Sequence, residues 1–293
     1  MTPKKLFALT TVAVITAFPA LPSAYAQRQA EPEGVQVEKP SRFRNLVPAE
    51  QIEAESVRQY AEMMAQAQQK GLLAPPGTPQ LQRLKRIANK LIPHVERWNE
   101  RAPEWEWDVN LIRGDSINAF AMPGGKIAFF SGIIDRLNLT DDEIAIVMAH
   151  EMAHALREHA RERLAKSGLT SAGARIAGIG LAAIFGIDPN LTTAATGGVA
   201  NLAMLRFSRS DETDADLVGL DIAARAGFDP RAGVALWKKM AAVNKSGPPQ
   251  WLSTHPAGDQ RITQMTRHMP SVLPIYARQK GTTVAKLPPY RGG

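Results

Sequence analysis

Cysteine is absent from this chain of 293 residues. Its absence excludes a disulfide scaffold, a zinc site built on thiolates, a cysteine nucleophile and the acylated cysteine of a bacterial lipoprotein. Hydrophobic residues supply 44% of the chain and charged residues 22%, which is typical of a globular protein rather than a disordered one. The length suffices for one large domain or two small ones with a sizeable buried core.

Aromatic residues are also scarce, at 6%, and no run of basic residues is interleaved with them. The formal net charge is +7, which could serve a nucleic acid, an anionic membrane surface or an acidic substrate. Because no basic and aromatic run accompanies this charge, we expect no nucleic-acid partner.

The first 26 residues are typical of a secretory signal peptide. Two lysines precede a mostly apolar stretch over residues 6–18, and Ala24 and Ala26 place small side chains where a signal peptidase reads them. An uncleaved membrane anchor is the alternative, but the apolar stretch is shorter than the ~20 residues that span a bilayer. Cleavage between Ala26 and Gln27 is therefore predicted, and with it a periplasmic protein.

Hydrophobic periodicity predicts a mainly helical α+β fold. Apolar residues recur at helical spacing over residues 50–70 and 79–101. Alternation predicts a half-buried strand over 105–111, followed by two short strands within 118–130 that a tight turn joins. We expect a flexible leader over 27–48, a folded domain over 49–270 and a loosely ordered basic tail over 271–293.

One long segment is almost without charge. Residues 176–205 contain a single charged side chain, Asp188, which divides them into pieces too short to cross a bilayer singly. Two buried or cleft-lining helices are one interpretation. A mobile lid, or weak contact with a membrane surface or a substrate, is the other.

The motif that carries chemistry is the string H-E-M-A-H at residues 150–154. Thr140 and Glu143 have the spacing of a capping box, which predicts that a helix begins just before the motif. His150 and His154 then lie on one face of that helix and can bind one metal ion, while Glu151 beside them can act as general base. Zinc suits imidazole and carboxylate ligands and needs no thiolate.

A catalytic zinc takes a third protein ligand, and the acidic run at residues 208–216 offers candidates. Glu212 and Asp216 are four residues apart and share a helix face, so one can bind the metal while the other hydrogen-bonds a ligand histidine. Asp211 and Asp214 point elsewhere and are interpreted as solvated charges.

Five segments together resemble the family of zinc endopeptidases that contains the CAAX prenyl protease and HtpX, and within it the soluble periplasmic branch of BepA and LoiP. They are N-A-F-A-M-P-G-G at 118–125, H-E-M-A-H at 150–154, the acidic run at 208–216, A-A-R-A-G-F-D-P at 223–230, and S-T-H-P at 253–256 with Arg261-Ile262. The resemblance implies a zincin-like (gluzincin) catalytic domain over 49–270, with a small β-sheet beside the active-site helix.

The resemblance also implies a role for each residue around the metal. His150, His154 and Glu212 would bind one Zn²⁺ per chain. Glu151 would be the general base, and Asp216 would orient a ligand from behind.

Three further residues receive roles by resemblance. Asn118, on an edge strand, would hold a substrate backbone in an extended pose, and a turn residue is the alternative. His255 and Arg261 would approach the metal side and either stabilise an oxyanion or gate the zinc, although His255 before a proline also fits a packed loop residue. His159 matches no ligand role and is interpreted as a solvated or capping histidine.

The function expected from these observations is that of a zinc-dependent metalloendopeptidase. Its substrates would be polypeptides, in particular unfolded or misassembled proteins of the cell envelope, and its role protein quality control. The alternative is a gated or inactive metal-binding module, similar to a chaperone, in which His255 or the 176–205 segment fills the open metal position. The sequence leaves the oligomeric state open.

Overall fold

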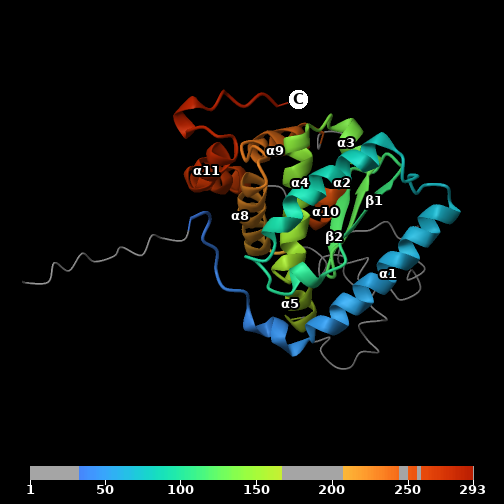
Figure 1. Ribbon diagram of the computed structural model, residues 1–293. Coiled ribbons are helices and arrows are strands. Elements are labelled where there is room, and N and C mark those ends of the chain that lie inside the picture. The colour runs from blue at the N-terminus through green and yellow to red at the C-terminus, as the bar shows by residue number, and fades with distance from the viewer. Residues whose placement is uncertain (1–32, 167–206, 244–249, 256–258, 293) are drawn as a thin grey trace, which may run out of the picture. The chain divides into compact units, whose positions relative to one another are not determined.

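The computed structural model describes residues 33–166, 207–243, 250–255 and 259–292. The predicted signal peptide and the uncharged segment 176–205 therefore lie outside the described residues. Helices dominate, as predicted (Figure 1). The described α-helices are α1 (Ala49–Gln69), α2 (Pro79–Leu91), α3 (Ser131–Arg136), α4 (Asp141–Leu156), α5 (His159–Lys166), α8 (Arg209–Arg225), α9 (Ala232–Val243), α10 (Gln250–Thr254) and α11 (Asp259–Gln279).

Three strands form one small sheet, which confirms the expected α+β class. They are β1 (Asp108–Ile112), β2 (Ala119–Met122) and β3 (Lys126–Phe130). The spatial order is β1-β3-β2, with β1 parallel and β2 antiparallel to β3. Both β2 and β3 are buried along their whole length, because helices cover both faces of the sheet.

The alternation of side chains along β3 divides the interior into two cores. Ile127 and Phe129 belong to the core that continues through α2, α4 and α8. Ala128 and Phe130 belong to a second core that α1 covers. The sheet thus joins α1 to the helices that carry the metal motif.

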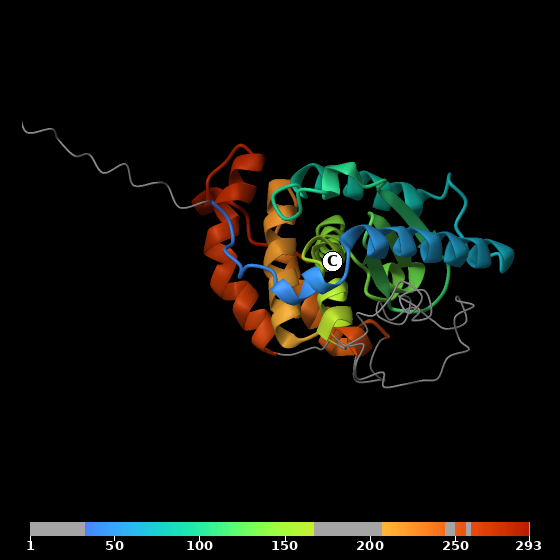
Figure 2. The same ribbon diagram turned by 90° about the horizontal axis from the view of Figure 1, so that it is seen from below.

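Helices α11, α8 and α4 and the sheet are stacked in that order (Figure 2). The predicted capping box is present at the start of α4: the Glu143 N–H donates to Thr140 Oγ1 at 3.3 Å, and the Thr140 N–H donates to Glu143 Oε2 at 2.8 Å. Almost all of α4 is buried, and a helix surrounded by protein on all sides makes a fixed support for a site.

The contact between α4 and α8 is unusually close at Gly219. A Cβ atom placed there would lie 3.0 Å from the backbone nitrogen of His150 and 3.2 Å from its Cα. Glycine therefore lets α8 approach the metal motif on α4 to backbone distance.

Residues 33–48, the described part of the stretch expected to be a flexible leader, pack against the domain. Val35 and Val47 are buried, and the Val35 N–H donates to the buried carboxylate of Asp221 at 3.2 Å. A short 3₁₀ helix, Arg42–Leu46, packs against α5 in the same stretch. Polar and proline-dotted composition suggested flexibility, but two apolar anchors and one buried hydrogen bond fix this segment.

The stretch expected to be a loosely ordered tail, residues 271–293, begins inside a helix. Helix α11 continues to Gln279, and Val272 and Ile275 are buried in the core. Pro270 and Pro274 lie inside this helix, although proline disfavours a helix interior. In contrast, Pro93 does end a helix early: α2 stops at Leu91 and does not reach residue 101. Within the described residues, no helix is both long enough and apolar enough to cross a membrane.

We expect Gly219→Ala to lower the free energy of unfolding by about 1–3 kcal/mol, because the added methyl overpacks the contact between two buried helices. This fall is the net effect, after the gain of about 1 kcal/mol that alanine brings over glycine in helix propensity. Chemical denaturation of the metal-free protein measures it. Gly77→Ala is the matched control, since nothing lies within 4 Å of the new Cβ, and a Gly219→Ala protein as stable as this control would contradict the prediction.

Candidate metal centre

The predicted site residues come together at the contact between α4 and α8. Helix α4 supplies His150, Glu151 and His154, and α8 supplies Glu212 and Asp216. All five are buried. His255 follows α10, and Arg261 enters the same region from α11.

Four side chains offer ligand atoms to one point. One atom each from His150, His154, Glu212 and His255 lies within 4.8 Å of the others. The Nε2 atoms of His150 and His154 are 3.2 Å apart, and His255 Nδ1 lies 3.3 Å from His150 Nε2. Glu212 Oε1 lies 3.0 Å from His255 Nδ1 and 3.5 Å from His154 Nε2.

These separations fit zinc. Four ligands at about 2.0–2.1 Å around a tetrahedral ion stand roughly 3.3 Å from one another. Three imidazole nitrogens and one carboxylate oxygen are also a donor set that zinc prefers. The same observation has a second meaning: with His255 included, all four tetrahedral positions have a protein ligand, as in structural zinc sites, whereas a catalytic zinc keeps one position open.

Asp216 and Arg261 stand behind this cluster. Asp216 Oδ1 lies 3.1 Å from His150 Nδ1, so the carboxylate holds the ring by the nitrogen that faces away from the cluster. Arg261 donates to both oxygens of Asp216, from Nη2 to Oδ1 at 2.6 Å and from Nε to Oδ2 at 2.7 Å. Its Nη1 lies 2.5 Å from Glu212 Oε2. Arg261 was expected either to stabilise an oxyanion or to gate the zinc. In the structure it compensates the charge of these two buried carboxylates.

Buried charges set the protonation of these acids. Burial opposes ionisation of Glu212, but the charges of His255 and Arg261 outweigh it and lower the pKa of Glu212 below 4.5. Burial opposes ionisation of Asp216 as well, and there Arg261 lowers the pKa below 3.8. Both carboxylates are therefore ionised, as a ligand and its supporting acid must be.

The pKa values of the two histidines on either side of Glu212 shift in opposite directions. Burial, together with the positive charges of nearby histidines and Arg261, lowers the pKa of His154 well below 6.5. His154 is thus neutral, the form that binds metal. Burial acts the same way on His255, but the carboxylates of Glu151 and Glu212 outweigh it and raise the pKa of His255 above 6.5.

Glu151 lies beside the cluster, held by a tryptophan. The Trp251 indole N–H donates to Glu151 Oε1 at 2.6 Å, and His255 Nε2 lies 3.6 Å from the same oxygen. The Trp251 ring also stacks on the His255 ring, with centroids 4.8 Å apart. Trp251 on α10 thereby contacts both the acid next to the ligands and the fourth ligand candidate.

Comparison with known proteins now places this geometry in a family. The model of Peptidase family M48 matches residues 79–268, well over half of the chain. The chain belongs to peptidase family M48. M48 peptidases are zinc-dependent metalloproteases, so the family agrees with the donor set described above and confirms the resemblance seen in the sequence.

Curated relatives that this M48 chain matches include OMA1 metalloendopeptidases and β-barrel assembly-enhancing proteases. It is 33% identical over 233 residues to the mitochondrial metalloendopeptidase OMA1 of Saccharomyces cerevisiae, covering 74% of this chain and 63% of that protein. It is 31% identical over 198 residues to human OMA1, covering 64% and 36%. It is 29% identical over 170 residues to the β-barrel assembly-enhancing protease of Escherichia coli K12, covering 56% and 35%. The chain spans less than two thirds of the length of each of these relatives.

The M48 site also contains residues that sequence reasoning missed. His159 was interpreted as a solvated or capping histidine and Asp214 as a solvated charge, yet His159 is 4% exposed and bonds both His154 and Asp214. No helical periodicity could reveal this, because Glu158 adopts a left-handed conformation, with φ of 59°, between α4 and α5. Trp251 had no signal beyond its closeness in sequence to His255.

Asn118, the proposed substrate-binding residue, stands just before β2, at an edge of the three-stranded sheet. It is buried, and its Oδ1 accepts the Ala119 N–H at 3.0 Å. The preceding carbonyl, of Ile117, accepts the Trp251 N–H at 3.1 Å. The start of β2 is thus tied to the helix that carries Trp251.

If Glu212 is the third protein ligand of the M48 site, Glu212→Ala removes the only carboxylate in the four-donor cluster. We expect zinc content after dialysis to fall from about one ion per chain to a small fraction of that. Asp211→Asn is the matched control, because Asp211 accepts the N–H of the N-cap residue Ser208, and the amide oxygen of asparagine can accept the same bond. A Glu212→Ala protein that keeps its zinc would mean that another acid is the ligand.

Proposed function

We propose that this protein is a zinc-dependent metalloendopeptidase that cleaves unfolded or misassembled proteins of the cell envelope. The observation that carries the proposal is the buried group of His150, His154 and Glu212 with Glu151 beside it. Membership of family M48 supports the reaction class, and the metalloendopeptidase relatives support polypeptides as substrates.

In this proposal His150, His154 and Glu212 hold the zinc. When bound, zinc would act as a Lewis acid that polarises a peptide carbonyl and lowers the pKa of a water molecule, so that the water loses a proton more easily. Glu151 takes the proton of the attacking water and later passes it to the leaving amine. Because Glu151 Oε1 accepts the Trp251 N–H, we assign this proton transfer to the other oxygen, Oε2.

Arg261 and Asp216 act from behind the ligands. The Arg261–Asp216 pair fixes the His150 ring, and the second arm of Arg261 fixes Glu212. Positioning of this kind keeps the ligand atoms in place while substrate and water exchange.

The substrate strand is proposed to lie along the edge of the sheet near Asn118, where an extended peptide can add to β2. A periplasmic location, with cleavage after Ala26, remains the proposal from the sequence. The β-barrel assembly-enhancing proteases among the relatives support envelope substrates, although the OMA1 relatives are named as mitochondrial proteins.

We expect Glu151→Gln to keep its zinc but to cleave casein at least about 100-fold more slowly, because the ligands remain and the base is gone. The readout is casein digestion, with the zinc content of each protein determined in parallel. Glu104→Gln, at an exposed position, removes a carboxylate without touching the site and serves as control. If Glu151→Gln digests casein at the wild-type rate, Glu151 is not the base.

A second candidate function is a gated metal-binding module that holds unfolded chains. One observation favours it: His255 Nδ1 stands at the fourth corner of the ligand cluster, where a catalytic site would admit water. Trp251, one helical turn earlier, engages Glu151 at the same time. In this state all four ligand positions have a protein donor, and one oxygen of Glu151 is bonded to Trp251.

His255→Ala distinguishes the two functions. If His255 is a gate, we expect the variant to retain zinc through the other three ligands and to digest casein several-fold faster than wild type, since the fourth position becomes accessible. Thr254→Ala, which leaves the imidazole in place, is the control. A loss of activity in His255→Ala with zinc retained would instead assign His255 to stabilising the oxyanion.

A further inference from the structure

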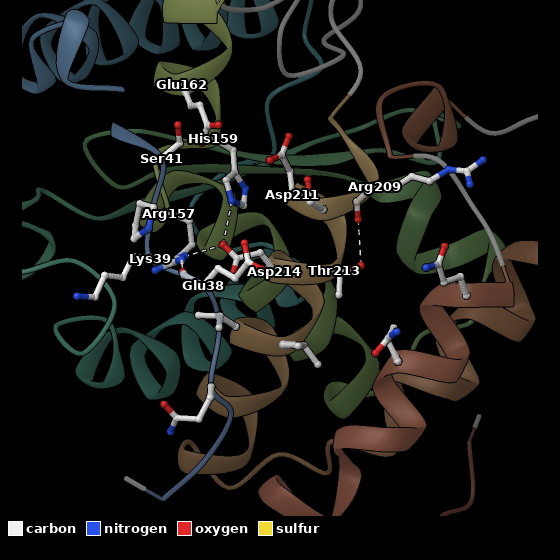
Figure 3. Close-up of a pocket in the computed structure, with 17 residues that line it drawn as sticks. Glu38, Lys39, Ser41, Arg157, His159, Glu162, Arg209, Asp211, Thr213 and Asp214 are labelled. Carbon is white, nitrogen blue, oxygen red and sulfur yellow. Dashed lines mark hydrogen bonds and ion pairs between the residues drawn. The ribbon is translucent and has the colours of Figure 1, made fainter. Parts of the chain in front are cut away.

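A chain of polar groups leads away from His154 on the side opposite the ligand cluster. His154 Nδ1 lies 2.9 Å from His159 Nδ1, and His159 Nε2 lies 3.1 Å from Asp214 Oδ2. Arg157 Nε donates to the same Asp214 oxygen at 2.6 Å. Figure 3 shows His159 and Arg157 both directed at Asp214.

The position of His154 Nε2 fixes the direction of the hydrogens. That nitrogen is the one in the ligand cluster, so a neutral His154 carries its proton on Nδ1. His154 Nδ1–H then donates to His159 Nδ1, which must be the unprotonated nitrogen of its ring. His159 Nε2–H in turn donates to Asp214 Oδ2, because an ionised carboxylate can only accept hydrogen bonds.

We propose that His159 and Asp214 are positioning residues for the ligand His154: together they fix its tautomer and the angle of its ring. His150 is supported directly by Asp216, whereas His154 is supported by a carboxylate acting through a second imidazole. The inference rests on the proposed zinc site but not on peptide hydrolysis.

The local backbone is built for this contact. Glu158, at φ of 59°, separates α4 from α5, and His159, the first residue of α5, contacts the ring of His154. Arg157 compensates the charge of Asp214 and also donates to the carbonyl of Glu38 in the N-terminal segment. A histidine that was only solvated would not be buried and would not contact both His154 and the partly buried Asp214.

A cavity of about 650 Å³ opens on the far side of this chain of hydrogen bonds, which runs from His154 through His159 to Asp214. His159 and Asp214 line it, together with Arg157, Glu38, Arg209 and Gln264. Truncation of His159 would therefore leave a space that continues into the cavity. A small molecule such as imidazole could enter that space and replace the missing ring.

The test is the zinc affinity of the full-length protein, measured by competition with a chromophoric chelator. His159→Ala and Asp214→Ala are each expected to weaken zinc binding by about 10–100-fold. His159→Gln is expected to restore most of it, since its amide oxygen can accept from His154 and its NH₂ can donate to Asp214. His268→Ala is the control; the His268 ring bonds the Gln264 carbonyl of its own helix.

Two further measurements separate positioning from a merely structural role. The double variant His159→Ala/Asp214→Ala should have the same zinc affinity as whichever single variant binds zinc more weakly, because both changes break the same chain of hydrogen bonds. Added imidazole should tighten zinc binding by His159→Ala and leave His268→Ala unchanged. Unaltered zinc affinity in His159→Ala, or a loss that neither glutamine nor imidazole restores while the metal-free protein keeps its melting temperature, would overturn the proposal. A wild-type protein that binds zinc but cuts no casein would refute the proposed function and leave this inference standing.

Discussion

The site depends on the backbone contact between α4 and α8. Ligands from two helices meet only if the helices approach more closely than ordinary side chains allow, and Gly219 permits that approach beside His150. Glu212, Asp216 and Gly219 recur at spacings of four and three, so they lie on one face of α8. The same face thereby supplies a ligand, the acid that holds another ligand, and the gap into which α4 fits. Stacking of α11 behind α8 then brings Arg261 to the two acids.

Burying this many ionisable groups is costly unless each is paired. Glu151, Glu212 and Asp216 are all buried, and isolated carboxylates in such a place would be protonated instead. Arg261 prevents this by contacting Glu212 and Asp216 together, while its guanidinium lies 3.8 Å from the centre of the Trp237 ring. The network holds its members at fixed angles, and rigidity of that kind is what a metal site needs from the residues behind its ligands.

The sequence predicted those parts of the site that follow helix periodicity. His150 with His154, and Glu212 with Asp216, are four apart, and each pair does share a face. The contribution of His159 could not be predicted, because it depends on a single left-handed residue after α4. Asp214 lies off the ligand face, as expected, but a second histidine meets it there.

Composition predicted the packing of the two terminal segments less well than helical periodicity predicted which residues share a helix face. The described part of the leader is held by Val35 and Val47, two apolar residues in a polar stretch. Helix α11 continues through Pro270 and Pro274, where local propensity predicts a break. In both segments tertiary packing outweighs the local preference, and packing partners far away in the chain leave no trace in the nearby sequence.

Trp251 and His255 are one helical turn apart, joined by the bond from the His255 N–H to the Trp251 carbonyl at 2.9 Å. If His255 gates the zinc, as the second candidate function has it, displacement of this turn frees the Trp251-bound oxygen of Glu151 and the fourth ligand position together. A peptide that entered the fourth position would then compete with His255 for it, so substrate binding and opening of the turn would favour each other reciprocally. The observed substrate affinity would then equal the intrinsic affinity multiplied by the fraction of molecules in which the turn is open. Every contact that stabilises the closed turn would lower the rate of hydrolysis at low substrate concentration and leave the rate of the chemical step unchanged.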